Sequence, residues 1–263
     1  MKYRLLPLRF IGCILGLLAW YFGPQDGAFV SHAQEANNDT ARITSIEPVA
    51  MISGVKATLK VRGFKLKDAS ALRFPMANEV IAEIKEKKDA GQPKGLENKT
   101  VGDTQLLVEL AFPSELPPGL LEYVISTPSG DVSGKLMVLT PSGVVDEAEP
   151  NNGFQEAQRL DMGLAARGNI QGDKDVDVYA LQGKSDQRLK VSVVTGGPLL
   201  IDAALHCYDE HGQFLASSDD GASRDPELVL SVPKDKSVFL CVSSAHDVGG
   251  EWHSYLLTVE EAK

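Results

Sequence analysis

Basic residues are scarce in this chain relative to acidic ones. Its 263 residues include 26 lysines and arginines against 36 aspartates and glutamates, which gives a formal net charge of −10 at pH 7. Such a surface, without a basic run, repels phosphate backbones and anionic lipid head groups. Nucleic acid and charged membranes are therefore unfavourable partners, whereas cations suit this surface.

Motifs of hydrolytic enzymes are also missing. The sequence contains no His-Glu-x-x-His zinc-protease motif and no Gly-x-Ser-x-Gly nucleophile elbow. Two weaker combinations remain, a zinc site at His206, Cys207 and His211 and a triad of Ser243 or Ser244 with His246 and Asp247. Strand alternation sends His206 and Cys207 to opposite faces, which disfavours the zinc site. We therefore expect a protein that is not an enzyme.

Long apolar runs are limited to the N-terminus. Basic residues precede an apolar run at residues 10–22, and small residues follow at Ser31 and Ala33, the layout of a signal peptide. The run is shorter than the roughly 20 residues of a transmembrane helix, and no second one follows. We expect a signal peptide at residues 1–33 and an exported protein, periplasmic, cell-surface or secreted. An uncleaved N-terminal anchor is the alternative.

Short segments that alternate apolar and polar residues recur along the rest of the chain. Ala57, Leu59 and Val61, for example, alternate with polar residues, as a strand with one buried face requires. Turns rich in proline and glycine separate these segments. The pattern predicts an all-β protein of two β-sandwich domains, because a sandwich of roughly 100 residues buries a workable core.

The domain boundaries follow from breaks in this alternation. We expect a disordered linker at residues 34–42, an immunoglobulin-like sandwich at 43–140, an acidic linker at 141–150 and a jelly-roll-like sandwich at 147–263. Within the first sandwich, the charged segment 79–99 is expected to form a loop insertion with a helical turn or two.

Two local features of the second sandwich can also be predicted. Residues 154–160 suit a short helix capped by Asn151 or Asn152. Cys207 and Cys241 are the cysteines left after cleavage of the leader, and an exported protein favours their pairing. Their strand phases differ, however, so free cysteines and a disulfide both remain open.

Oxygen-bearing side chains gather at the start of the second predicted domain. They are Glu147, Glu149, Asn151 and Asn152, followed by Asp173, Asp175 and Asp177. Hard oxygen ligands in this number suit Ca²⁺. If residues 173–177 are extended, alternate carboxylates share one strand face, and a buried cluster of them needs a cation. The alternative is that these side chains cap a helix and shape turns.

The same segments carry a family resemblance. Residues 147–152 read Glu-Ala-Glu-Pro-Asn-Asn, and residues 175–179 read Asp-Val-Asp-Val-Tyr after a Gly-Asp pair. With the closing strand at 255–259, they resemble the bacterial pre-peptidase C-terminal domain over residues 147–260. The residues 43–48 and the turn at 126–130 make the preceding domain similar to the immunoglobulin-like IPT/TIG fold.

The resemblance implies a ligand set. Calcium-binding members of the family, the collagen-binding domains of clostridial collagenases, hold the ion with carboxylates and amides of this linker and strand. The matching positions here are Glu147, Glu149, Asn151, Asn152 and Asp177. Such a member has acidic residues in place of Asn152 and Lys174, so a weaker site is implied, with Asp173 or Asp175 as additional ligands.

The resemblance implies interaction rather than catalysis. We expect a non-catalytic binding or accessory module, steadied by Ca²⁺ at the junction of its domains, whose partner is an extracellular protein or a polysaccharide. The alternatives are the non-catalytic tail of a secreted hydrolase or peptidase system and a structural spacer of the cell envelope. Tyr255 is expected in the core of the sandwich and Trp252 over its end. No aromatic row on an outward strand face is apparent, so collagen binding is not expected.

Overall fold

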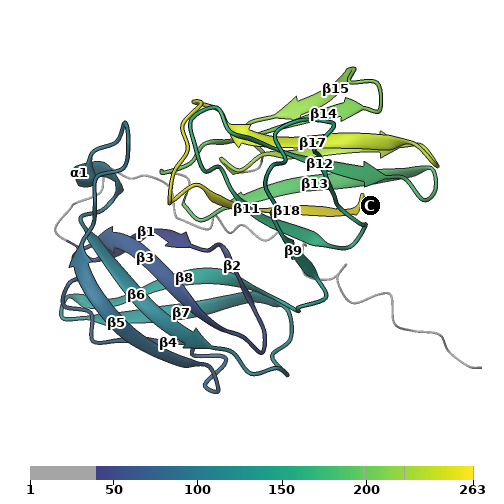
Figure 1. Ribbon diagram of the computed structural model, residues 1–263. Helices are drawn as coiled ribbons and strands as arrows, with labels where there is room; N and C mark the ends of the chain where they lie inside the picture. The colour runs from purple at the N-terminus through teal and green to yellow at the C-terminus, as the bar shows by residue number, and fades with distance from the viewer. Residues whose placement is uncertain (1–39, 198, 222, 263) are drawn as a thin grey trace, which may run out of the picture.

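The computed structural model describes residues 40–262 except residues 198 and 222. The predicted signal peptide lies outside the described residues. The first half of the described chain forms two four-stranded sheets (Figure 1). Its elements are β1 Arg42–Glu47, β2 Ala50–Ile52, β3 Lys56–Phe64, β4 Ala71–Arg73, β5 Ile81–Asp89, α1 Asn98–Val101, β6 Thr104–Ala111, β7 Gly119–Thr127 and β8 Gly130–Leu139. The sheet orders are β1-β3-β6-β5 and β2-β8-β7-β4.

The second half forms two five-stranded sheets. Its strands are β9 Val144–Asp146, β10 Gln158–Arg159, β11 Ala165–Asn169, β12 Val176–Gln182, β13 Gln187–Thr195, β14 Ala203–Asp209, β15 Phe214–Ser218, β16 Glu227–Val232, β17 Ser237–Ser244 and β18 Ser254–Glu261. The sheet orders are β10-β12-β17-β14-β15 and β16-β13-β18-β11-β9. The predicted all-β fold is confirmed.

Each half has its own apolar core, which the two-residue alternation produces. Leu106, Val108 and Leu110 of β6 point into the first core, and Leu189 and Val191 of β13 point into the second. Their neighbours on the same strands face outward, since successive side chains leave opposite faces of a strand. Within the described residues, no helix is long and apolar enough to cross a bilayer.

The charged segment 79–99 is not the predicted loop. Ile81–Asp89 forms β5, which pairs antiparallel with β6 along its whole length. The spacing of Ile81 and Ile84 imitated a helix, but it is Ala82 and Ile84 that pack on the core, while Ile81 is 69% exposed. β5 is an edge strand, and its many charges suit an edge because they oppose pairing with other chains. Among the described residues, α-helix is confined to the four residues of α1.

Three further expectations are corrected near domain boundaries. The predicted helix at 154–160 is replaced by turns and by β10, which runs parallel to β12. The predicted linker 141–150 contains β9, which pairs with β11 of the second sandwich. The predicted disordered linker ends earlier, since Arg42 already pairs with Phe64. In each case a strand partner distant in sequence supplies backbone hydrogen bonds that local patterns do not reveal.

The two sandwiches pack against each other over a substantial surface. The N–H of Ile46 donates to the carbonyl of Gly196 at 2.9 Å, and a Cβ atom on Gly196 would lie 2.1 Å from the Ile46 oxygen. Lys60 pairs with Glu251 across the same boundary at 2.9 Å. Two apolar clusters cross it, one of Val49, Ala50, Ala165 and Leu256 and one of Val101, Leu200 and Trp252.

Cys207 and Cys241 are free, so the open question of a disulfide is answered. Cys207 lies in the core opposite Leu240, whereas Cys241 pairs with His206 on the other face of the same sheet. Burial raises the pKa of both thiols to about 12. We expect neither to react with Ellman's reagent in the native protein, and both to react in guanidinium, because thiolates are the reactive form. A mass that shifts on reduction would contradict this.

Candidate metal centre

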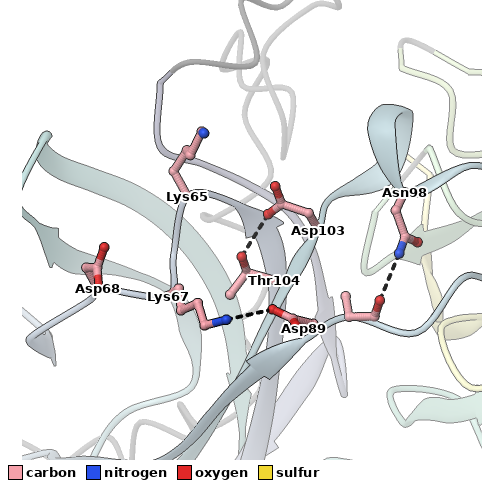
Figure 2. Close-up of a pocket in the computed structure, with 8 residues that line it drawn as sticks. Lys65, Lys67, Asp68, Asp89, Asn98, Asp103 and Thr104 are labelled. Carbon is pink, nitrogen blue, oxygen red and sulfur yellow. Dashed lines mark hydrogen bonds and ion pairs between the residues drawn. The ribbon is translucent and has the colours of Figure 1, made fainter.

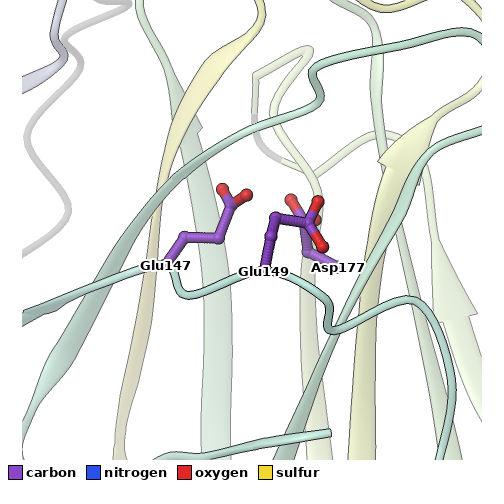
Figure 3. Close-up of side chains that lie close together, drawn as sticks. All are labelled: Glu147, Glu149 and Asp177. Carbon is purple, nitrogen blue, oxygen red and sulfur yellow. The ribbon is translucent and has the colours of Figure 1, made fainter. Parts of the chain in front are cut away.

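Three carboxylates converge where the chain enters the second sandwich. Glu147 follows β9, Glu149 lies two residues further on, and Asp177 is in β12. Figure 3 shows the three side chains close together. One oxygen of each lies within 4.8 Å of the others. Pairing of β9 with β11 fixes the first segment against the sandwich. The structure thus brings together residues that are separated by almost thirty positions in sequence.

Asp177 is the most enclosed member of this carboxylate cluster. It is fully buried, and its Oδ2 accepts a hydrogen bond of 2.6 Å from the hydroxyl of Tyr255, which lies 2.7 Å from that of Tyr179. Burial raises the pKa of Asp177 to about 8; the Tyr255 hydrogen bond opposes this rise, and the charges of Glu147 and other carboxylates add to it. Either a proton or a cation therefore stabilises Asp177 at neutral pH.

Asn151 contributes an amide to the same point. Its side chain is fully buried, and its backbone N–H donates to Glu149 Oε2 at 2.9 Å. In one amide orientation its oxygen faces only the oxygens of Asp177 and Glu149. In the other, its nitrogen donates to both, each at 3.2 Å. The second orientation suits an empty cluster and the first a cluster around a cation, because an amide oxygen is a cation ligand.

Glu147 is held by neighbouring groups that also orient it. Its Oε2 accepts from the backbone N–H of Asn169 at 2.5 Å, and its Oε1 accepts from Gln171 Nε2 at 3.2 Å. Burial raises the pKa of Glu147, and these hydrogen bonds partly offset the rise. Outer groups of this kind fix a metal ligand in place before the ion arrives.

The remaining predicted ligands lie outside the cluster. Asp173 pairs with Lys94 of the first sandwich, and Asp175 accepts from the backbone N–H of Gln171 at 2.6 Å. Asn152 is placed to donate to Asp175 Oδ1 at 2.7 Å. The expected strand face of three alternate carboxylates is wrong, because Lys174 has a φ of 62° and β12 begins only at Val176.

Tyr255 and Tyr179 belong to the site, although the sequence placed Tyr255 only in the core. A signal was present: Asp177 and Tyr179 share the inward phase of β12, and a carboxylate at an inward position must find a polar partner. The identity of that partner depends on β18, which is far away in sequence. Local alternation therefore indicated that Asp177 needs a polar partner, but not that Tyr255 supplies it.

A cavity of about 480 Å³ on the first sandwich carries charges of both signs (Figure 2). Lys67 Nζ pairs with Asp89 at 3.0 Å, Thr104 Oγ1 donates to Asp103 at 2.7 Å, and Asn98 donates to the Ala90 carbonyl at 2.8 Å. These polar groups form hydrogen bonds and ion pairs with one another, and they do not converge on one point where a ligand could bind. The cavity therefore lacks the convergence seen at the carboxylate cluster.

The two combinations that the sequence disfavoured, the zinc site and the Ser-His-Asp triad, do not assemble among the described residues. His206 lies on the outer face of its sheet, and Cys207 lies in the core. The ring of His246 lies 3.3 Å from Asp202, while its backbone N–H, not its ring, contacts the Ser244 hydroxyl. Among the described residues, this leaves Ser244 without the base that the proposed triad requires.

Comparisons with known proteins found one sequence relative and several similar solved structures. No family model matches the chain. A probable subtilase-type serine protease of Deinococcus radiodurans is 32% identical over 108 residues, 39% of this chain and 15% of that protein. The chain thus spans about a seventh of the length of this relative.

Two solved structures illustrate the architecture. The pre-peptidase C-terminal domain of collagenase from Bacillus anthracis is 20% identical and matches 43% of this chain and 100% of that domain, with a TM-score of 0.34. A Bacteroides ovatus protein of a mixed-linkage glucan utilization locus, solved with a mixed-linkage heptasaccharide, is 9% identical over 84% of this chain and 74% of its own, with a TM-score of 0.28. The chain resembles the pre-peptidase C-terminal domain, as the motifs indicated, and its architecture is that of an all-β sandwich protein.

Proposed function

We propose that this chain is an exported, non-catalytic binding module that holds a calcium ion at Glu147, Glu149, Asn151 and Asp177. The convergence of three carboxylates with a buried amide oxygen carries the proposal. At an effective dielectric of about 20, each fully ionised pair at this separation repels by about 3 kcal/mol. Calcium removes that repulsion, and water or backbone oxygens complete its six to eight ligands.

The position of the proposed ion indicates a structural role at the junction of the two sandwiches. Asp146, the residue before Glu147, pairs with Arg167 at 2.7 Å, and Arg167 donates to the Ala50 carbonyl of the first sandwich at 2.9 Å. An ion at Glu147 therefore fixes the chain segment that enters the domain junction. The proposed role is structural: calcium steadies the entry to the second sandwich while another surface binds the partner.

The subtilase-type relative favours a second candidate function, in which the module accompanies a peptidase. A stretch of that protein shares 32% identity with this chain. The module would then act as a non-catalytic accessory part beside a secreted peptidase. The carboxylate cluster would have the same structural role there, so calcium binding is compatible with both candidates.

Calcium titration into the chelator-treated protein is expected to show saturable binding with release of most of a proton at pH 7. The proton comes from Asp177, whose pKa of about 8 keeps it protonated before calcium binds. Calorimetry in two buffers of different ionisation enthalpy measures this release. An Asp177→Asn variant is expected to bind calcium more weakly and to release no such proton.

The matched control is Glu122→Gln, which removes a carboxylate from an exposed position of β7 in the first sandwich. It is expected to bind calcium as the wild type does. Absence of heat and of any change in melting temperature with calcium would contradict the metal centre. Equal calcium affinity in the Asp177→Asn and wild-type proteins would mean that calcium binds at another site.

A further inference from the structure

Aromatic side chains form a row on the outer face of the β10-β12-β17-β14-β15 sheet. Phe239 of β17 lies opposite Tyr208 of β14, and Tyr208 lies opposite Phe214 of β15. Leu240 and Cys207, their chain neighbours, point into the core. The three aromatic residues therefore face away from the core on three adjacent strands.

Phe154 completes this row, which we call the aromatic strip (Phe154, Phe239, Tyr208 and Phe214). Its ring stacks on Phe239 at 4.5 Å between centroids and 16° between planes, and it lies 5.3 Å from Tyr208. Tyr208 and Phe214 are 5.9 Å apart. Phe214 is 59% exposed and Phe154 41% exposed. Hydrophobic burial alone does not explain rings left open to solvent in a row.

The expectation of no outward aromatic row is therefore wrong. Phe239, Tyr208 and Phe214 become neighbours through the strand order β17-β14-β15, which alternation does not reveal. Phe154 joins them because its segment turns across the sheet instead of forming a helix. Gly212 permits this approach, since a Cβ atom there would lie 3.2 Å from the Phe154 ring.

The charged groups beside the strip are paired with one another. Glu210 pairs with Lys236 at 2.5 Å, and the carboxylate of Asp209 accepts the backbone N–H groups of His211 and Gln213, both at 2.8 Å. The strip therefore lacks an unpaired cationic rim for an anionic ligand, and the net charge of −10 repels polyanions. Charge therefore disfavours an anionic partner.

The shape of the strip narrows the choice further. The exposed rings of Phe214 and Phe154 form an open face, which lines neither of two cavities of about 480 and 330 Å³ elsewhere on the molecule. Neighbouring rings are inclined by 55° and 73°, which makes a twisted platform. A twisted platform suits a single flexible chain better than a flat crystalline surface.

We infer that the aromatic strip binds a single chain of a neutral polysaccharide. The C–H faces of its sugar rings stack on Phe214 and Tyr208, since aromatic faces are negative and apolar, while the Tyr208 hydroxyl and His206 hydrogen-bond to sugar hydroxyls. The ring spacing is comparable to the width of one sugar ring. The inference names the partner of the binding module and so rests on the proposed function.

Affinity gel electrophoresis tests it with soluble β-glucan and galactomannan as neutral polymers, polygalacturonate as an anionic polymer and gelatin as a polypeptide. A neutral polymer is expected to retard the wild type, and Phe214→Ser to weaken that binding at least about tenfold, as for the loss of an aromatic contact that contributes strongly to an interface. Val229→Ser is the matched control, because Val229 is 45% exposed on β16 of the opposite sheet. Melting temperatures verify that both variants fold.

Each outcome decides the inference. Retardation by a neutral polymer that is lost in Phe214→Ser but kept in Val229→Ser supports it. Retardation by gelatin or polygalacturonate alone overturns the assignment of a neutral polysaccharide while leaving a binding module. Retardation that both variants keep, or none by any polymer, overturns the strip as the site. The calcium titration is read separately, so loss of the metal centre is distinguishable from loss of the glycan surface.

Discussion

In calcium-free buffer, the melting temperature of this protein is expected to fall as the pH rises from about 5 to about 9. Burial raises the pKa of Asp177 to about 8, against 3.8 for an ordinary aspartate. The folded state therefore binds this proton more tightly than the unfolded state, and the stability it contributes is present at low pH and lost as the pH passes 8. The linked free energy is at most about 6 kcal/mol.

The Asp177→Asn variant isolates this effect. Its side-chain oxygen still accepts the Tyr255 hydrogen bond but carries no charge, so its melting temperature is expected to be nearly flat over the same range. At pH 9 without calcium it is expected to exceed the wild type by on the order of 10 °C. Saturating calcium is expected to flatten the wild-type curve, because the ion replaces the proton at the carboxylate.

Scanning calorimetry in chelator at several pH values provides the measurement. Glu122→Gln serves again as the control, and its curve is expected to follow the wild type. A wild-type melting temperature that stays constant from pH 5 to 9 without calcium would show that Asp177 titrates in its ordinary range. A slope that persists in Asp177→Asn would assign the effect to other groups, such as Glu147.

The strands were predictable because alternation is a local property. Leu59 and Val61 of β3 are buried as their period of two indicates. Ile81 and Ile84 misled, because charged residues at an edge strand face solvent on both sides and leave no clear period. Patterns therefore identify strands with one buried face and fail at edges, where burial no longer separates the two faces.

The carboxylate cluster was predictable in part for a similar reason. Glu147 and Glu149 are close in sequence, and Asp177 follows a recognisable motif, so their association could be inferred before the fold was known. Asp173 could not be placed, since its partner Lys94 comes from the other sandwich. Contacts between distant segments depend on strand order and on the packing of the domains.

The aromatic strip shows the same dependence on topology. Phe239 and Tyr208 were visible as aromatic residues on separate strands, and only hydrogen-bonded pairing of β14 with β17 makes them neighbours. Surface patches of this kind are assembled across strands rather than along them. A sequence that specifies its core through periodicity therefore carries little local information about its ligand-binding faces.

Replacing Trp252 with alanine is expected to lower the free energy of unfolding by about 3 to 5 kcal/mol. Trp252 is 5% exposed and packs with Val101 of the first sandwich and Leu200 of the second. The guanidinium of Arg62 lies 5.7 Å from its ring centroid, which adds a cation–π contact across the boundary. The indole thus fills the junction of the two sandwiches, and its removal leaves a cavity there.

The same variant tests whether the sandwiches unfold together. Because the interface contains backbone hydrogen bonds, ion pairs and two apolar clusters, the wild type is expected to show one calorimetric transition. Trp252→Ala is expected to separate it into two, whereas Val229→Ala at an exposed position of β16 is expected to keep one. Two transitions already in the wild type would mean that the sandwiches are independent.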